Sequence, residues 1–282
     1  MLVNNTVKRV FAFGCSFTNY FWSTWAEIVA LDLNADLYNY GRSGAGNTFI
    51  ANTVAQADAV YKFNKDDLVI VSWTNVCRED RWRGQGWVTP GNIFTQVQYD
   101  QDYVKNWADP VGYMVRDLGQ IHLTKGLLEK TNCNFHMFQM VKLLEQIDPK
   151  GKRNAITNPH QKRLSEMYKE TLDFIKPSFF SVLWNDDIYN NKMLKDKKFY
   201  NGNFADGHPT PLEHLEYLKA IFPEHTIKSS TIDAVTKVEE SLQSFIKSKA
   251  TKPFTMYQLS DIELEELKSK TRLKHNSSFH RV

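Results

Sequence analysis

Residues 7–18 of the chain are VKRVFAFGCSFT, an apolar run that ends in a glycine and is followed by a serine. A short apolar run of this kind, closed by Gly14, predicts a buried β-strand over 7–13. Ser16 would then stand at the carboxyl end of that strand. We expect a helix to begin there, so that backbone N–H groups and the helix dipole face the Ser16 hydroxyl and any anion formed beside it.

The segments that follow alternate between helix and strand. Apolar residues at helical spacing predict helices over 21–33, 48–63, 111–130 and 161–175, and apolar runs predict strands over 35–40, 67–73 and 134–141. The run SFFSVLW (178–184) is expected to be a final strand or a buried loop. This alternation favours parallel pairing, so we predict a doubly wound, three-layer α/β/α fold of the flavodoxin-like kind. Ligands of such sheets bind beyond the carboxyl ends of the strands.

Two segments depart from this alternation. Residues 77–110 have no clean period and are dense in Trp, Tyr, Gly and charge, which is typical of a lid or binding loop. Beyond residue 225, an apolar stripe at helical spacing predicts a helix, and Ser260 with Glu263 fits a capping box. We therefore expect an α/β domain over 1–225 and a helical extension over 226–282. The extension should dock on the core or on a second copy of the chain, forming a homo-oligomer, and should be dispensable for chemistry.

Composition is that of an ordinary globular protein. Of the 282 residues 42% are hydrophobic and 24% charged, and the formal net charge of +3 is too small to indicate nucleic acid or an anionic membrane as a partner. No apolar run approaches the ~18 residues of a membrane helix, and the first residues lack the pattern of a cleaved signal, so we expect a soluble, cytoplasmic protein. The cysteines (Cys15, Cys77, Cys133) and the histidines lack disulfide-framework or zinc spacing, so we expect no metal and no cofactor.

Four short blocks, in order along the chain, resemble those of the SGNH (GDSL-like) hydrolase superfamily. GCSFT (14–18) resembles the G-D-S-L-T block, with Cys15 in the Asp place and Phe17 in the Leu place. NYGRSGAGN, SWTN and DGHPTPLEHLEYL resemble the second, third and fifth blocks; they lie at 39–47, 72–75 and 206–218. The resemblance spans residues 11–218 and implies an enzyme that acts on ester bonds.

The resemblance implies a catalytic triad. Ser16 takes the place of the nucleophile, His208 that of the general base, and Asp206 that of the acid that orients the imidazole. Ester cleavage needs a hydroxyl nucleophile and an imidazole that takes and returns its proton, and this set supplies both. The family spaces acid and base as D-x-x-H, whereas this chain has D-x-H. Either Asp206 reaches His208 across the shorter spacing, or a backbone carbonyl orients the imidazole.

The same resemblance implies an oxyanion hole. It would consist of the N–H groups of Ser16 and Gly44 and the side-chain amide of Asn75, with Gly46 as the alternative to Gly44. Residues close to Asn75 in sequence are candidates for binding the substrate at the mouth of the site, although a core position or a solvated salt bridge would explain them equally well; they are Trp73, Arg78 and Glu79.

Other functions compete with the esterase. GRSGAGNT (41–48) matches G-x-x-x-x-G-K-[ST] except for Asn47 in the place of the lysine, which makes a nucleoside triphosphatase a weaker hypothesis. An O-acyltransferase with the same site, or a non-catalytic carbohydrate-binding protein of the same fold, would also fit the blocks. The polar, Trp-rich segment 77–110 lacks a long apolar stretch, which favours a short acyl group on a small-molecule or saccharide ester.

Overall fold

The core of the fold is a parallel sheet of four strands in the order β2-β1-β3-β6. The computed structural model describes residues 2–3, 6–95, 98–144, 146–147, 153–154 and 159–274. The strands are β1 (Arg9–Gly14), β2 (Asp36–Gly41), β3 (Asp67–Trp73) and β6 (Asn134–Gln139). They confirm the four predicted strands to within two residues at either end.

The two central strands are apolar on both faces because helices cover both faces of the sheet. In β1, Val10 to Gly14 are buried, and all seven residues of β3 are buried. Parallel pairing places Phe13 opposite Val71 of β3, and Gly14 opposite Gly41 of β2. The carboxyl ends of these three strands therefore lie side by side, and the order reverses direction between β1 and β3, where ligands of such folds bind.

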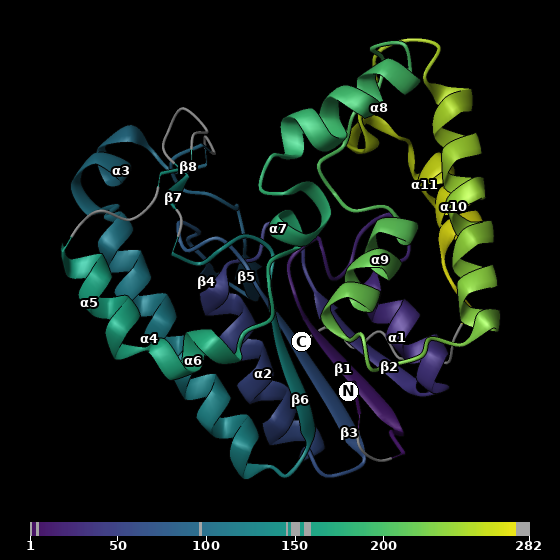
Figure 1. Cartoon of the computed structure of the whole chain (residues 1–282). Helices are drawn as coiled ribbons and strands as arrows, with labels where there is room; N and C mark the ends of the chain where they lie inside the picture. The colour runs from purple at the N-terminus through teal and green to yellow at the C-terminus, as the bar shows by residue number, and fades with distance from the viewer. Residues whose placement is uncertain are drawn as a thin grey trace.

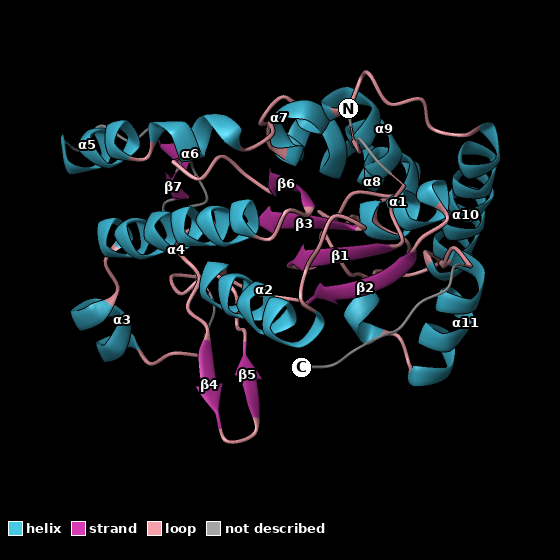
Figure 2. Ribbon diagram, turned by 90° about the horizontal axis from the view of Figure 1, so that it is seen from below, coloured by secondary structure: helices cyan, strands magenta, loops and turns pink. Residues whose placement is uncertain are grey.

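Helices form the two outer layers (Figure 1). On one side of the sheet lie α2 (Asn47–Tyr61) and α4 (Pro110–Lys130), which pack against each other; on the other side lie α1 (Trp25–Leu33) and α9 (Pro211–Ile221). Figure 2 shows the same layers from below. The predicted doubly wound α/β/α architecture is confirmed.

Three local expectations were wrong. Residues 178–184 form a helix, α7 (Phe179–Trp184), because Ser178 caps it by accepting a hydrogen bond from the Ser181 N–H. The helix predicted over 161–175 is divided into α5 (Pro159–Met167) and α6 (Lys169–Phe174). No helix begins at Ser16; α1 begins only at Trp25, where Thr24 and Glu27 form a capping box.

The segment 77–110 contains short elements rather than one continuous loop. It holds an antiparallel hairpin, β4 (Arg81–Arg83) with β5 (Gly86–Val88), and a short helix, α3 (Gln101–Trp107). Four more short elements follow β6 in the chain: β7 (Gln146–Ile147), β8 (Arg153–Asn154), the π-helix η1 (Tyr189–Met193) and α8 (Leu194–Phe199).

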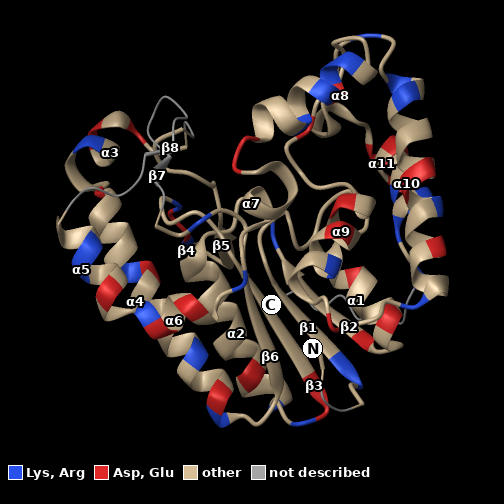
Figure 3. Ribbon diagram, viewed as in Figure 1, with Lys and Arg blue, Asp and Glu red and all other residues tan. Residues whose placement is uncertain are grey.

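The last part of the chain that the structure describes, residues 229–274, is largely helical, as predicted. It comprises α10 (Ser229–Lys249), a 3₁₀ turn, η2 (Met256–Gln258), and α11 (Asp261–Thr271), which begins with the expected capping box of Ser260 and Glu263. The apolar stripe of α10 is buried within the chain, where α10 contacts α9, α1 and α11, so it is not left free for a second copy. Figure 3 shows basic and acidic residues mixed along α4 and α10. Among the described residues, no helix is both long and apolar enough to cross a membrane.

Candidate active site

Ser16 lies in a tight turn just beyond β1. The backbone N–H of Thr18 donates to the Cys15 carbonyl at 2.9 Å, which folds the chain back over the strand end. A Cβ at Gly14 would lie 2.1 Å from Thr18 Oγ1 and 3.1 Å from the Ser72 carbonyl oxygen, so the turn packs closely against this glycine. Ser16 is buried, with 7% of its surface exposed.

Three side chains from distant parts of the sequence form one hydrogen-bonded chain. Ser16 Oγ is 2.9 Å from His208 Nε2, and His208 Nδ1 is 2.6 Å from Asp206 Oδ1. The Asp206 carboxylate accepts a hydrogen bond from Nδ1–H, which leaves Nε2 as the acceptor for the Ser16 hydroxyl. The structure thus brings together the three residues in which the sequence predicted nucleophile, base and acid.

The short D-x-H spacing is accommodated by a local turn. Asp206 Oδ1 accepts both the backbone N–H of His208, at 2.7 Å, and the imidazole Nδ1–H. Burial would raise the pKa of Asp206, but the hydrogen bonds and charge of His208, together with a hydrogen bond from Tyr20, bring that pKa below its usual value. The carboxylate is therefore ionised at neutral pH and available as a counter-charge.

Tyr20 belongs to the same cluster, although no sequence motif pointed to it. Its hydroxyl donates to Asp206 Oδ2 at 2.8 Å, and its ring stacks on that of His208. A tyrosine four residues after a serine matches no pattern. Only the fold, which brings residue 20 beside residues 206–208, discloses the contact.

Asn75, one of the predicted oxyanion donors, has an oriented and unused amide group. Its Oδ1 accepts the backbone N–H of Cys77 at 2.8 Å, which fixes the side chain so that Nδ2 is the free end. Nδ2 is buried and has no hydrogen-bond partner among the described residues. A buried donor without a hydrogen-bond partner costs about 1–3 kcal/mol of stability. Such a donor therefore typically binds a ligand or a water molecule.

Of the two glycines proposed for the oxyanion hole, Gly46 already donates its N–H to another group of the protein. The N–H of Gly46 donates to Asp80 Oδ1 at 2.9 Å, so that donor is occupied. Gly44 has a φ of 73°, and a Cβ there would lie 2.1 Å from the Thr89 carbonyl oxygen. The engagement of Gly46 favours Gly44 as the residue whose N–H can face a substrate.

The segment 41–48, which resembles a phosphate-binding loop, is already occupied by a carboxylate of the protein itself. The Asp80 carboxylate accepts the N–H groups of Gly46 and Phe49 at the start of α2, where a phosphate would sit. Asn47, in the place of the absent lysine, is wholly buried; it bonds to Asp117 and to both backbone polar groups of Thr74. These contacts speak against the nucleoside triphosphatase hypothesis.

The three predicted substrate-binding residues fall in different places. Trp73 is wholly buried in the hydrophobic core, which favours the core position over a place at the mouth of the site. Arg78 donates to the Ala45 carbonyl at 2.8 Å and thereby braces the loop that carries Gly44. Glu79 lines a separate cavity, where it pairs with Arg81 and Arg116.

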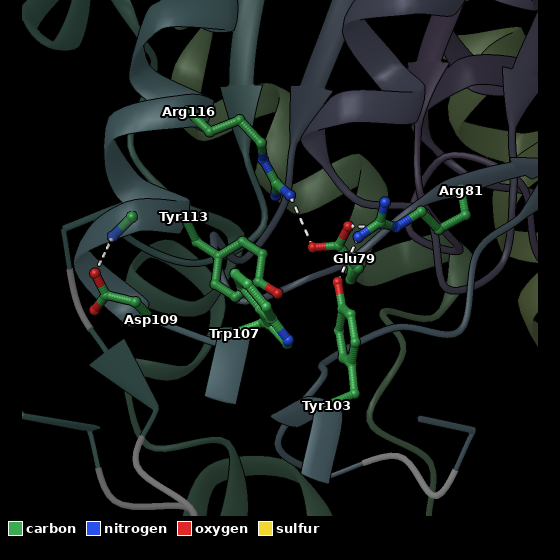
Figure 4. Close-up of a pocket in the computed structure, with 8 residues that line it drawn as sticks. Glu79, Arg81, Tyr103, Trp107, Asp109, Tyr113 and Arg116 are labelled. Atoms are coloured by element: carbon green, nitrogen blue, oxygen red, sulfur yellow. Dashed lines mark hydrogen bonds and ion pairs between the residues drawn. The ribbon is translucent and has the colours of Figure 1, made fainter. Parts of the chain in front are cut away.

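That cavity, of about 420 Å³, lies between the segment after Asn75, α3 and the start of α4 (Figure 4). Tyr103, Trp107 and Tyr113 supply aromatic surface, and Glu79, Arg81, Asp109 and Arg116 supply charge. Arg116 also donates to the Arg78 carbonyl at 2.7 Å, so the cavity wall is linked through Arg78 to the Gly44 loop.

Within the described residues, no group of three or more His, Cys, Asp or Glu side chains could hold a metal ion.

No protein-family model and no curated protein matches the sequence. Among solved structures, a lipolytic protein of the G-D-S-L family from Veillonella parvula is 12% identical; the match covers 76% of this chain and 97% of that one, with a TM-score of 0.40. A putative lipolytic protein of that family from Desulfitobacterium hafniense is 14% identical, with coverages of 76% and 98% and a TM-score of 0.40. A GDSL-like lipase from Bacteroides thetaiotaomicron is 13% identical, with coverages of 77% and 86% and a TM-score of 0.38. At such identities and TM-scores we infer neither activity nor substrate from these proteins. Over about three quarters of its length, the chain is similar to solved proteins described as G-D-S-L lipolytic proteins and a GDSL-like lipase.

Proposed function

We propose that the protein is a serine esterase in which Ser16 is the nucleophile, His208 the general base and Asp206 the orienting acid. The single observation that carries the proposal is the hydrogen-bonded chain from Ser16 Oγ through both ring nitrogens of His208 to Asp206. It lies at the carboxyl end of the sheet, where such folds bind ligands. A non-catalytic binding protein would have no need of this order of donor, base and acid.

The geometry supports a two-step acyl transfer to water. Ser16 Oγ attacks the acyl carbonyl while its proton passes to His208 Nε2, and Asp206 stabilises the imidazolium that forms. The carbonyl oxygen becomes an oxyanion, for which the Asn75 amide and the Gly44 N–H are the proposed donors, together with the Ser16 N–H. Collapse expels the alcohol, which takes the proton from Nε2. Water, activated by the same imidazole, then releases the acid from Ser16.

The cavity beside Glu79 supports a substrate with a polar ring, such as a saccharide that carries a short ester. Two basic and two acidic side chains line it, so it has no net charge to select an ion; they are Arg81, Arg116, Glu79 and Asp109. Trp107, which is 75% exposed, offers a free aromatic face. Aromatic faces flanked by charged hydrogen-bonding groups suit the apolar face and the hydroxyl rim of a pyranose ring.

The test uses two kinds of ester. On p-nitrophenyl acetate, butyrate and octanoate, the wild type should prefer the shortest chain, and Ser16→Ala should be inactive on all three. On an acetylated disaccharide, Trp107→Ala should lower kcat/KM about tenfold, the loss of one aromatic contact of about 1.5 kcal/mol, while p-nitrophenyl acetate is unaffected.

Trp82→Ala is the matched control, since Trp82 is 55% exposed but does not line the cavity. Equal losses of kcat/KM in the two tryptophan variants would mean that the cavity does not bind the substrate. A preference for the octanoate would contradict the short-acyl proposal.

A further inference from the structure

Tyr20 contacts both the proposed acid and the proposed base. Its hydroxyl donates to Asp206 Oδ2 at 2.8 Å. Its ring lies against the His208 ring, with the centroids 3.7 Å apart and the planes 17° from parallel. Because His208 donates its backbone N–H and its Nδ1–H to the same oxygen, Oδ1, Tyr20 is what holds the other carboxylate oxygen. One side chain therefore fixes the rotation of the carboxylate and the plane of the imidazole.

The electrostatics keep Tyr20 in the donor form. Burial, and after it the charge of Asp206, raises the pKa of the Tyr20 hydroxyl, with Tyr257 of the C-terminal extension adding to the effect. The phenol is thus protonated throughout the ordinary pH range and always able to donate to the carboxylate. A hydrogen bond to a charged group is stronger than one between neutral groups, and buried ones order their partners most effectively.

The backbone around Tyr20 is held by the end of α11. The Arg272 guanidinium donates to the Tyr20 carbonyl, and to Asn19 Oδ1 at 3.0 Å. Ser23 forms a two-way contact: its N–H donates to the Thr271 carbonyl at 3.0 Å, and its hydroxyl accepts the Leu273 N–H at 2.8 Å. The last described residues thus bind the chain between the nucleophile and α1, some 250 positions earlier.

The C-terminal extension also supplies side chains that pack around Tyr20. Tyr20 and Trp22 belong to a small core, separate from the main one, which α10, η2 and α11 supply with apolar residues; these are Leu242, Phe245, Ile246, Met256 and Leu267. Trp22 also donates from Nε1 to the Pro209 carbonyl at 2.8 Å, next to His208. Residues 19–23 are therefore enclosed between the extension and the loop that carries the acid and base.

We propose that Tyr20 is a positioning residue for the Asp206–His208 pair and that the C-terminal extension holds it in place, so that the extension belongs to the catalytic machinery. This rests on the proposed esterase function. It replaces the sequence-based expectation that residues 226–282 are dispensable. It also accounts for how a pair with the shortened D-x-H spacing is kept rigid: the local turn secures one carboxylate oxygen, and Tyr20 secures the other.

The first test is Tyr20→Phe, which keeps the ring stacking and the core but removes the hydroxyl. We expect kcat for p-nitrophenyl acetate to fall about tenfold to a hundredfold with KM unchanged, since only the proton-transfer geometry is disturbed. The downfield proton resonance of the His208 Nδ1–H should also shift or broaden. Tyr217→Phe is the matched control, because Tyr217 is also buried and the variant loses a hydrogen bond to the Pro177 carbonyl, which is not one of the site residues.

The second test addresses the extension. Arg272→Ala should lower kcat in the same direction, and Arg272→Lys should recover part of it, because lysine keeps the charge beside Glu27 but lacks the planar fork that reaches Tyr20 and Asn19. A Tyr20→Phe enzyme within twofold of wild type, with its downfield resonance unmoved, would overturn the positioning role. A Ser16→Ala enzyme that stays active would instead overturn the esterase proposal itself, so the two failures are distinguishable.

Discussion

Asn75 offers a sharp test of the oxyanion hole because its two ends have separate duties. Oδ1 holds the turn by accepting the Cys77 N–H, and Nδ2 is buried with no partner in the part of the chain that the structure describes. Asn75→Ala removes both ends. Asn75→Asp has the same shape and keeps an acceptor for Cys77 but replaces the free donor with an oxygen. Comparing the two variants therefore separates the donor from the turn.

The structure sets the size of each effect. Loss of one oxyanion donor costs about 2.7–4 kcal/mol in the transition state, a factor of ~10²–10³ in kcat. In Asn75→Ala the Cys77 N–H loses its acceptor, a destabilisation of about 1–3 kcal/mol, partly offset because an unpaired buried donor is also removed. Asn75→Asp should keep the turn and yet lose at least as much in kcat, because its carboxyl oxygen faces the developing oxyanion.

The assay is steady-state kinetics on p-nitrophenyl acetate, with urea unfolding measured on the same samples. We expect kcat to fall ~10²–10³-fold in both variants while KM changes by less than about threefold, since the amide acts on the transition state. A change confined to KM would mean that Asn75 only binds the ground state. An Asn75→Asp enzyme of normal rate would refute the role outright.

Three further results are expected. Asp206→Asn should lower kcat by ~10⁴, the loss known for the model Ser-His-Asp triad. The single amide oxygen cannot accept hydrogen bonds from both His208 and Tyr20 as the two carboxylate oxygens do, and the negative charge beside the imidazolium is lost. A loss of only tenfold in kcat would mean that the site is a Ser-His dyad. Gly44→Ala should lower kcat and the thermal midpoint together, since φ is 73° and the new Cβ would meet the Thr89 carbonyl; unchanged kinetics would move the donor elsewhere. Burial lowers the pKa of His136 to about 4, so the folded state binds fewer protons than the unfolded state, whose histidine titrates near 6.5. Stability is then full above pH 6.5 and falls by up to roughly 3 kcal/mol as pH drops to about 4; in urea unfolding, His136→Gln should lack this part of the loss.

Local patterns were enough to predict the sheet. The strands over 9–14 and 67–73 are continuous apolar runs because both faces are covered, and such runs are visible without knowledge of their neighbours. The π-helix at 189–193 and the division of 161–175 into two helices have no comparable local sign. Residues 178–184 show why short apolar runs are ambiguous, since the Ser178 cap, and not the apolar content, makes them helical.

The candidate site divides along the same line. Ser16, Asn75 and His208 could be predicted because each stands at a strand end or just before a helix, where the fold brings chain ends together. Tyr20 and Arg272 could not, because their roles depend on contacts across about 190 and 250 residues. The anion that fills the start of α2 was equally hidden: Asp80 lies in a segment without periodicity, and only the structure places it at Gly46 and Phe49.

The central claim, that Ser16 is a nucleophile activated by His208, is tested most directly by mapping the adduct of a fluorophosphonate. Such a probe forms a covalent bond only with a serine whose proton is removed by an adjacent base. Mass spectrometry of the labelled, digested protein should place a single adduct on the peptide that contains Ser16. His208→Ala should suppress that adduct while the protein stays folded. An adduct on another serine, or labelling of Ser16 that is undiminished in His208→Ala, would contradict the claim.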